Sequence, residues 1–122
     1  MNNLIIGDGA MGTELRRRGV KVPSHVKSIW SALALKEANS TIEEIHIDYI
    51  EAGSDYITIN NYAVTRPILS RVNLDNELES LTIKSIELAK SALSKTNSKK
   101  IKVLGEIIKF NLVDNQKNKT IQ

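Results

Sequence analysis

Short apolar runs alternate along this chain with longer segments of helical periodicity, and this alternation restricts the fold more than any other feature of the sequence. The strand-like runs cover residues 3–6, 56–60 and 101–104, and helix-like segments separate them. The order strand, helix, strand, helix, strand is typical of parallel strands joined by right-handed crossovers. The sequence therefore predicts an α/β fold.

The clearest helix is predicted over residues 41–52, where apolar residues recur at spacings of three and four. A capping box beginning at Ser40 or Thr41 would start it, and Gly53 is placed to end it in a left-handed conformation. A second long helix is predicted over residues 76–95, with Asn76 as its cap.

The remaining segments are predicted to connect these elements. A short helix within residues 11–18 is expected to stop at Gly19, and residues 20–28 are expected to form a loop. Residues 66–76, which contain Pro67, are predicted to be a polar connection.

The length of 122 residues limits how large the α/β fold can be. A complete (β/α)8 TIM barrel takes about 250 residues, so the chain has room for only two to three βα units of such a barrel. A small, open, doubly wound sheet is the alternative.

The composition is that of an ordinary globular domain, with 41% hydrophobic and 25% charged residues. Six Lys and two acidic residues in 99–122 account for the net charge of +3, since the rest of the chain is close to neutral. A basic end with few aromatic residues argues against a nucleic-acid partner. Without a long apolar run or a signal-like start, we expect no membrane association and a cytoplasmic location.

The carboxyl ends of the predicted strands are where ligand-binding residues of parallel α/β folds lie. Asp8 follows the first strand, where its carboxylate can bind an ammonium group or a metal, or only cap a turn. The glycines at 7, 9 and 12 fit tight turns or close ligand contact, and they lack the spacing of a nucleotide-binding loop.

A polar group, Asn60, Asn61 and Tyr62, follows the second strand and can either bind the polar head of an amino acid or close the strand with an Asx turn. Trp30 can line an apolar pocket or simply be buried. His46 lies on an apolar helix face, where a packing role with satisfied hydrogen bonds is the simpler interpretation. We assign no catalytic role to it or to His25.

Three motifs, DGAMGTELRRRG (8–19), WSALAL (30–35) and IHIDYIEAGSDYITINNYAVT (45–65), resemble the start of the homocysteine S-methyltransferase family. The resemblance implies a (β/α)8 barrel that transfers a methyl group to the sulfur of homocysteine, in a step of methionine biosynthesis. It also implies a zinc ion, held by three cysteine thiolates, that activates this sulfur.

Carried to this chain, the resemblance makes Asp8 the residue that binds the homocysteine amino group and makes Gly9 a backbone contact beside it. Trp30 and Tyr62 would line the pocket around the sulfur and the methyl donor. The resemblance implies no catalytic residue and no metal ligand within this chain.

The chain contains no cysteine. We therefore expect it to hold no zinc and to be inactive as an isolated chain, as a truncated, amino-terminal fragment of the family. Residues 1–104 are interpreted as part of the homocysteine-binding barrel domain, and residues 105–122 as a divergent polar tail. We expect activity only where a complementary chain supplies the missing cysteines and strands. The alternative is a non-catalytic remnant or small binding module that self-associates through exposed sheet edges.

Overall fold

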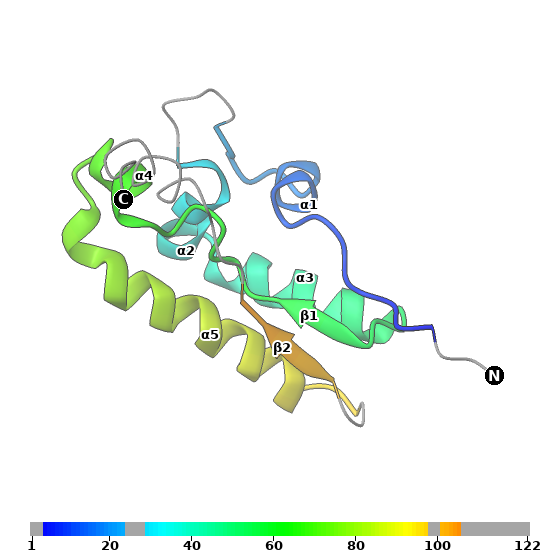
Figure 1. Ribbon diagram of the computed structural model, residues 1–122. Helices are drawn as coiled ribbons and strands as arrows, with labels where there is room; N and C mark the ends of the chain where they lie inside the picture. Colours follow the sequence, from blue (N-terminus) through cyan, green and yellow to red (C-terminus); the bar gives the residue numbers. More distant parts are fainter. Residues whose placement is uncertain (1–3, 24–28, 98–100, 106–122) are drawn as a thin grey trace.

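The computed structural model describes residues 4–23, 29–97 and 101–105 (Figure 1). The described part contains, in chain order, α1 (Gly12–Arg17), η1 (Trp30–Leu33), α2 (Ala34–Glu37), α3 (Asn39–Glu51), β1 (Tyr56–Thr58), α4 (Arg66–Ser70), η2 (Asp75–Glu77), α5 (Leu78–Ser94) and β2 (Lys102–Leu104), where η marks a 3-10 helix. None of these helices is long and apolar enough to cross a membrane.

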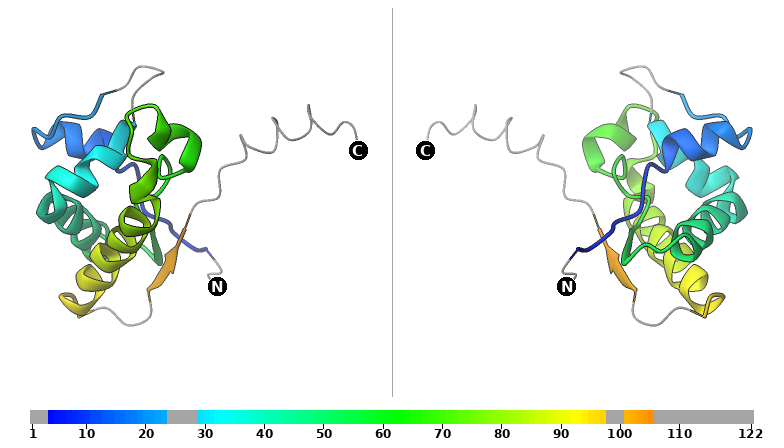
Figure 2. Two further views of the ribbon diagram at one scale, coloured as in Figure 1. Left: turned by 90° about the vertical axis from the view of Figure 1, so that its left-hand side faces the viewer. Right: turned by 90° about the vertical axis from the view of Figure 1, so that its right-hand side faces the viewer.

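A parallel pair, β1 and β2, makes up the sheet in the described residues, with Tyr56 opposite Lys102 and Thr58 opposite Leu104. Two helices, α3 and α5, pack against each other and cover one face of this pair (Figure 1 and Figure 2). On that face Ile57 and Ile59 are buried among apolar side chains of both helices. The predicted α/β fold with parallel strands is thus confirmed.

The larger of the two apolar clusters in the described residues lies among the helices rather than under the sheet. It joins α1 through Leu15, α3 through Ile42 and Ile45, and α4 through Leu69, all of which are completely buried. Burying one such side chain contributes about 1.5–3 kcal/mol. Helix packing therefore supplies more of the stabilisation than the three-residue strands do.

Both glycines that were predicted to end helices do so. Gly19 and Gly53 have φ values of 89° and 110°, which favour glycine. The residue after each glycine donates its backbone N–H back into the helix, from Val20 to Leu15 at 2.9 Å and from Ser54 to Tyr49 at 3.1 Å. This Schellman arrangement satisfies carbonyl groups that a helix end would otherwise leave unpaired.

The predicted helix starts are wrong by two residues. α3 begins at Asn39, and its N-cap residue Ala38 makes no side-chain cap, because α2 ends immediately before it and the Ala38 N–H bonds to the Ala34 carbonyl at 2.8 Å. α5 begins at Leu78 after the single turn η2, so Asn76 lies in η2 instead of capping the helix. In both places the backbone N–H of the N-cap residue, Ala38 or Glu77, bonds to a carbonyl of the preceding turn.

The connection predicted over residues 66–76 contains a helix, α4. The Thr65 hydroxyl accepts a hydrogen bond from the Ile68 backbone N–H at 3.4 Å, and Pro67 occupies the first turn. Proline is compatible with a helix at this point because its missing N–H would have no partner there. Its presence therefore marked a helix start rather than a loop.

The first predicted strand is absent from the described residues 4–6. Leu4, Ile5 and Ile6 are 81%, 74% and 57% exposed, although the segment lies beside the turn that leads into β1 (Figure 1). One backbone hydrogen bond joins it to β1's entry, from the Asp55 N–H to the Ile6 carbonyl at 2.6 Å. An apolar run becomes a parallel strand only when neighbouring elements cover it, and the described residues do not cover this one.

Candidate functional site

A cavity of about 390 Å3 opens where β1 ends, which is within the size range of small-molecule sites. Its walls come from the loop before α1, from α1 itself, from η1 and from the residues around the end of β1. They consist of Gly9, Ala10, Met11, Gly12, Thr13, Arg16, Val22, Trp30, Ser31, Thr58, Ile59, Asn60 and Tyr62. Three of the four predicted substrate-binding residues, Gly9, Trp30 and Tyr62, therefore line one cavity.

The fourth, Asp8, lies beside the cavity without lining it. Its carboxylate accepts hydrogen bonds from the Thr58 backbone N–H at 2.7 Å and from the Thr58 hydroxyl at 3.2 Å. Thr58 itself lines the cavity. Asp8 thus replaces a strand carbonyl at this edge of β1 and is partly exposed, so its role in binding substrate stays a prediction.

Close packing, rather than turn geometry, explains two of the loop glycines. A Cβ atom on Gly7 would collide with the Tyr56 ring, and one on Gly9 would lie 2.7 Å from the Tyr49 hydroxyl oxygen. Neither glycine is among the described residues with positive φ. These two positions therefore need glycine because two tyrosines approach the backbone on either side of Asp8.

The aromatic wall of the cavity is formed by Trp30 and Tyr62. Their ring centroids are 6.2 Å apart at an interplanar angle of 77°, an edge-to-face arrangement. The Arg71 guanidinium lies 5.9 Å from the Trp30 ring centroid, within cation–π distance. Tyr62 is 54% exposed, so its ring remains available at the cavity mouth.

The backbone at Trp30 adopts φ 46°, a conformation that costs a residue with a side chain of this size roughly 1–3 kcal/mol. The next residue, Ser31, is buried and joined to the end of β1. Its hydroxyl donates to the Asn60 side-chain oxygen at 2.7 Å, and the Asn60 amide donates to the Ser31 carbonyl at 3.0 Å. The Asn60 side chain is therefore engaged in fixing the aromatic wall.

Arg16 is a cavity residue that the sequence interpretation did not single out. It projects from α1, and its guanidinium donates to the Val22 carbonyl at 2.9 Å. The signal was available, because a helix that follows the Gly9–Gly12 loop carries residue 16 one turn beyond Gly12. The cationic group gives the cavity a partner for an anionic substrate group.

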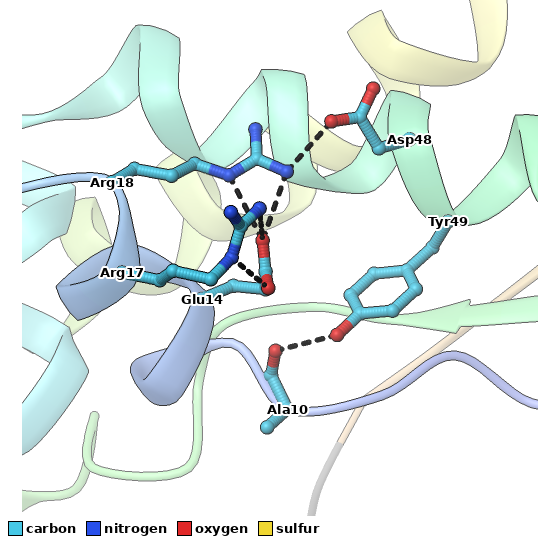
Figure 3. Close-up of polar contacts among 6 residues, drawn as sticks. All are labelled: Ala10, Glu14, Arg17, Arg18, Asp48 and Tyr49. Atoms are coloured by element: carbon cyan, nitrogen blue, oxygen red, sulfur yellow. Dashed lines mark hydrogen bonds and ion pairs between the residues drawn. The ribbon is translucent and has the colours of Figure 1, made fainter.

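An ion-pair network fastens α1 to α3 next to the loop (Figure 3). The Glu14 carboxylate accepts from Arg17 at 2.9 Å and from Arg18 at 3.0 Å, and Arg18 also contacts Asp48 on α3 at 2.7 Å. The hydrogen bond from Arg17 is the main cause that lowers the pKa of Glu14 to about 2. The network keeps Glu14 ionised and connects the two helices that flank the loop.

His46 is completely buried on α3, as the helix pattern predicted. The expectation of satisfied hydrogen bonds is wrong, because within the described residues neither ring nitrogen has a partner. Burial lowers the pKa of His46 below its usual 6.5, against the opposing effects of Asp8 and Glu43. The imidazole is thus a neutral packing group. His25 lies outside the described residues.

The donor set does not fit a thiolate zinc centre. The sequence contains no cysteine, and no three His, Cys, Asp or Glu side chains are grouped for a metal ion in the parts of the chain that the structure describes. Structural and catalytic zinc sites need at least three protein ligands. No zinc ligand is therefore assigned to these residues.

A parallel strand, a cavity at its carboxyl end and a mostly apolar and aromatic wall are typical of an α/β protein, and they make this cavity a candidate small-molecule site. The chain belongs to the homocysteine S-methyltransferase family, whose model matches residues 5–116. This match extends past residue 104, into the segment interpreted as a divergent tail. The division at that residue stays a prediction.

Curated relatives and solved structures agree with the family. The chain is 36% identical over 99 residues to Homocysteine S-methyltransferase 1 of Arabidopsis thaliana, covering 80% of this chain and 29% of that protein. It is 36% identical over 91 residues to Homocysteine S-methyltransferase of Escherichia coli, covering 74% and 28%. The metallated form of the homocysteine methyltransferase MmuM from Escherichia coli superposes with a TM-score of 0.78 and 29% identity, over 99% of this chain and 44% of that structure.

These shares show that the chain spans less than a third of the curated relatives' length. More than two thirds of each of these relatives therefore has no counterpart in the matched part of this chain.

Proposed function

We propose that this chain forms the amino-terminal, homocysteine-binding units of a homocysteine S-methyltransferase barrel. The observation that supports the proposal is that Gly9, Trp30 and Tyr62 line one cavity, with Asp8 beside it, at the carboxyl end of β1. The carboxyl ends of barrel strands are where substrates bind in (β/α)8 enzymes.

In this proposal the partly exposed carboxylate of Asp8 pairs with the substrate ammonium group, while Thr58 keeps the carboxylate oriented. The cationic Arg16 and the backbone of Gly9 face the substrate carboxylate. Trp30 and Tyr62 enclose the thioether or thiol end, where an apolar wall excludes water from the sulfur.

Binding is tested by titrating the 15N-labelled protein with L-homocysteine and recording the chemical shifts of its backbone amides. We expect a dissociation constant on the order of 1 mM or weaker, because a few hydrogen bonds and two aromatic contacts replace a metal–sulfur bond. Asp8→Asn should abolish the shifts of the Gly9–Gly12 amides, whereas the control Asp75→Asn, in η2, should leave them unchanged. Submicromolar binding without zinc, or equal shifts in Asp8→Asn, would contradict the proposal.

The absence of cysteine leads us to propose that the chain alone holds no zinc and transfers no methyl group. Equilibrium dialysis against a zinc buffer should leave well under one bound equivalent, and assays with S-methylmethionine and homocysteine should give no methionine. One tightly held zinc ion per chain, or turnover that Asp8→Ala removes, would refute this proposal.

A non-catalytic module that self-associates is the second candidate. It is favoured by the exposed apolar side chains of residues 4–6 and by Leu104, 42% exposed on β2. Exposed strands of this kind promote pairing between chains. Light scattering across protein concentration tests it: Ile5→Lys should shift an oligomer to monomer, and a monomer at all concentrations would rule the candidate out.

A further inference from the structure

Tyr49 lies on α3 and does not line the cavity, but it contacts the Gly9–Gly12 loop, which does. Its hydroxyl donates a hydrogen bond to the Ala10 carbonyl at 2.9 Å (Figure 3). We propose that Tyr49 is a positioning residue, which sets the place of the Gly9–Ala10 backbone and through it the binding of the substrate's amino-acid group. The inference rests on the proposed function for the identity of the ligand.

The contact is directional as well as close. Beyond the hydrogen bond, the ring and hydroxyl of Tyr49 occupy the space that a Cβ atom on Gly9 would need, at 2.7 Å for the oxygen and 3.1 Å for the ring. The hydrogen bond holds the Ala10 carbonyl towards α3, and the ring sets how near Gly9 can approach the helix. Together they fix two successive peptide units of the cavity wall.

The helix that carries Tyr49 is itself anchored. Arg18 reaches from the end of α1 to Asp48, the residue before Tyr49, at 2.7 Å, while Glu14 holds Arg18 from within α1 (Figure 3). The loop is therefore restrained at its far end by the α1–α3 ion pairs and in its middle by Tyr49. Without the tyrosine hydroxyl, the middle restraint is lost while the helix packing remains.

Tyr49→Phe removes this hydroxyl and keeps the ring. The matched control is Tyr56→Phe, since the Tyr56 ring packs against Gly7 but its hydroxyl makes no hydrogen bond within the described residues. We expect 15N relaxation order parameters of Ala10 and Met11 to fall from about 0.85 to below about 0.6 in Tyr49→Phe only, with α5 unchanged. Unchanged loop order, or a uniform loss across the protein, would overturn the inference.

A double-mutant cycle tests the packing contact. Gly9→Ala should lower the melting temperature by about 4 °C or more in the wild type. In the Tyr49→Phe background, Gly9→Ala should lower the melting temperature by less than half as much, because the Tyr49 hydroxyl oxygen, the atom nearest to the added Cβ, is absent. Equal losses in both backgrounds would show that Tyr49 and Gly9 are not coupled.

A homocysteine titration completes the test. Tyr49→Phe should weaken binding about fivefold, the effect of one hydrogen bond, while the melting temperature falls by no more than about 4 °C, the cost of the same hydrogen bond in folding. If the wild type binds and the variant binds equally despite a looser loop, the positioning inference fails and the proposed function stands. If the wild type does not bind, the proposed function fails, while loop order and the Gly9 cycle still decide whether Tyr49 positions the loop.

Discussion

Ser31 and Asn60 lie 29 residues apart in the sequence and bind each other through two hydrogen bonds, both buried. Ser31→Ala leaves the Asn60 oxygen without this donor, and we expect a loss of about 1–3 kcal/mol in the free energy of unfolding. Urea denaturation measures the loss, and the fluorescence of the single tryptophan, Trp30, reports whether the aromatic wall moves.

The control for this substitution is Ser70→Ala. Ser70 is exposed and donates to the Arg66 carbonyl within α4 at 2.8 Å, so its removal should change stability by less than about 0.5 kcal/mol. If the two substitutions lowered the free energy of unfolding equally, the buried Ser31–Asn60 pair would contribute no more to stability than an exposed hydrogen bond within a helix.

The α1–α3 ion pairs make a second prediction. Arg18→Met removes a side chain that is 21% exposed and contacts both Glu14 and Asp48, and it should destabilise the protein by about 1 kcal/mol. Lys84→Met is the matched control, because Lys84 is 41% exposed and its ion pair with Glu87, at 3.7 Å, lies within α5. Thermal melts at low and high salt should show a salt-sensitive loss for Arg18→Met and almost none for the control.

Burial of His46 predicts an acid-sensitive fold. Since the pKa of His46 is lower in the folded protein than in the unfolded chain, protons favour unfolding, and stability is complete above about pH 6.5 and falls below it. His46→Leu should remove this loss between pH 7 and pH 5 without reducing stability at pH 7. His25→Gln, which leaves His46 in place, should retain the loss. Urea midpoints across pH give the measurement, and a slope that His46→Leu leaves unchanged would contradict the assignment.

Glu14 predicts a separate effect at lower pH. Because its pKa is lowered to about 2, its ionised form stabilises the folded state above about pH 4.5, and this contribution is lost as pH falls from there towards 2. Glu14→Gln should flatten the stability profile in that window alone. An identical profile would show that Arg17 and Arg18 do not hold the carboxylate in solution.

The sequence predicted what depends on local pattern. The residues of α3 repeat at helical spacing, and Gly19 and Gly53 have the freedom that a helix end requires, so these features could be placed from neighbouring residues alone. The motifs also singled out Gly9, Trp30 and Tyr62, which line one cavity in the structure, and their part in substrate binding stays a prediction.

What the sequence did not predict depends on distant partners. The apolar residues 4–6 indicated a buried strand, but burial requires elements that pack on them, and a local pattern cannot supply these. The Asp8–Thr58 and Tyr49–Ala10 hydrogen bonds join residues 50 and 39 positions apart. Such pairs follow from the tertiary structure, so the cavity could be located from the sequence but its supports could not.

The register that places Tyr56 opposite Lys102 also has a kinetic consequence. Pairing β1 with β2 closes a long loop that contains α4 and α5. Closing this loop lowers the conformational entropy of the chain, and the three residue pairs can stabilise the protein only after it has closed. During folding the helices should therefore associate first and the two strands should pair last. During unfolding the strands should separate first. In pulse-labelling exchange, the amides of β2 should gain protection after those of α3.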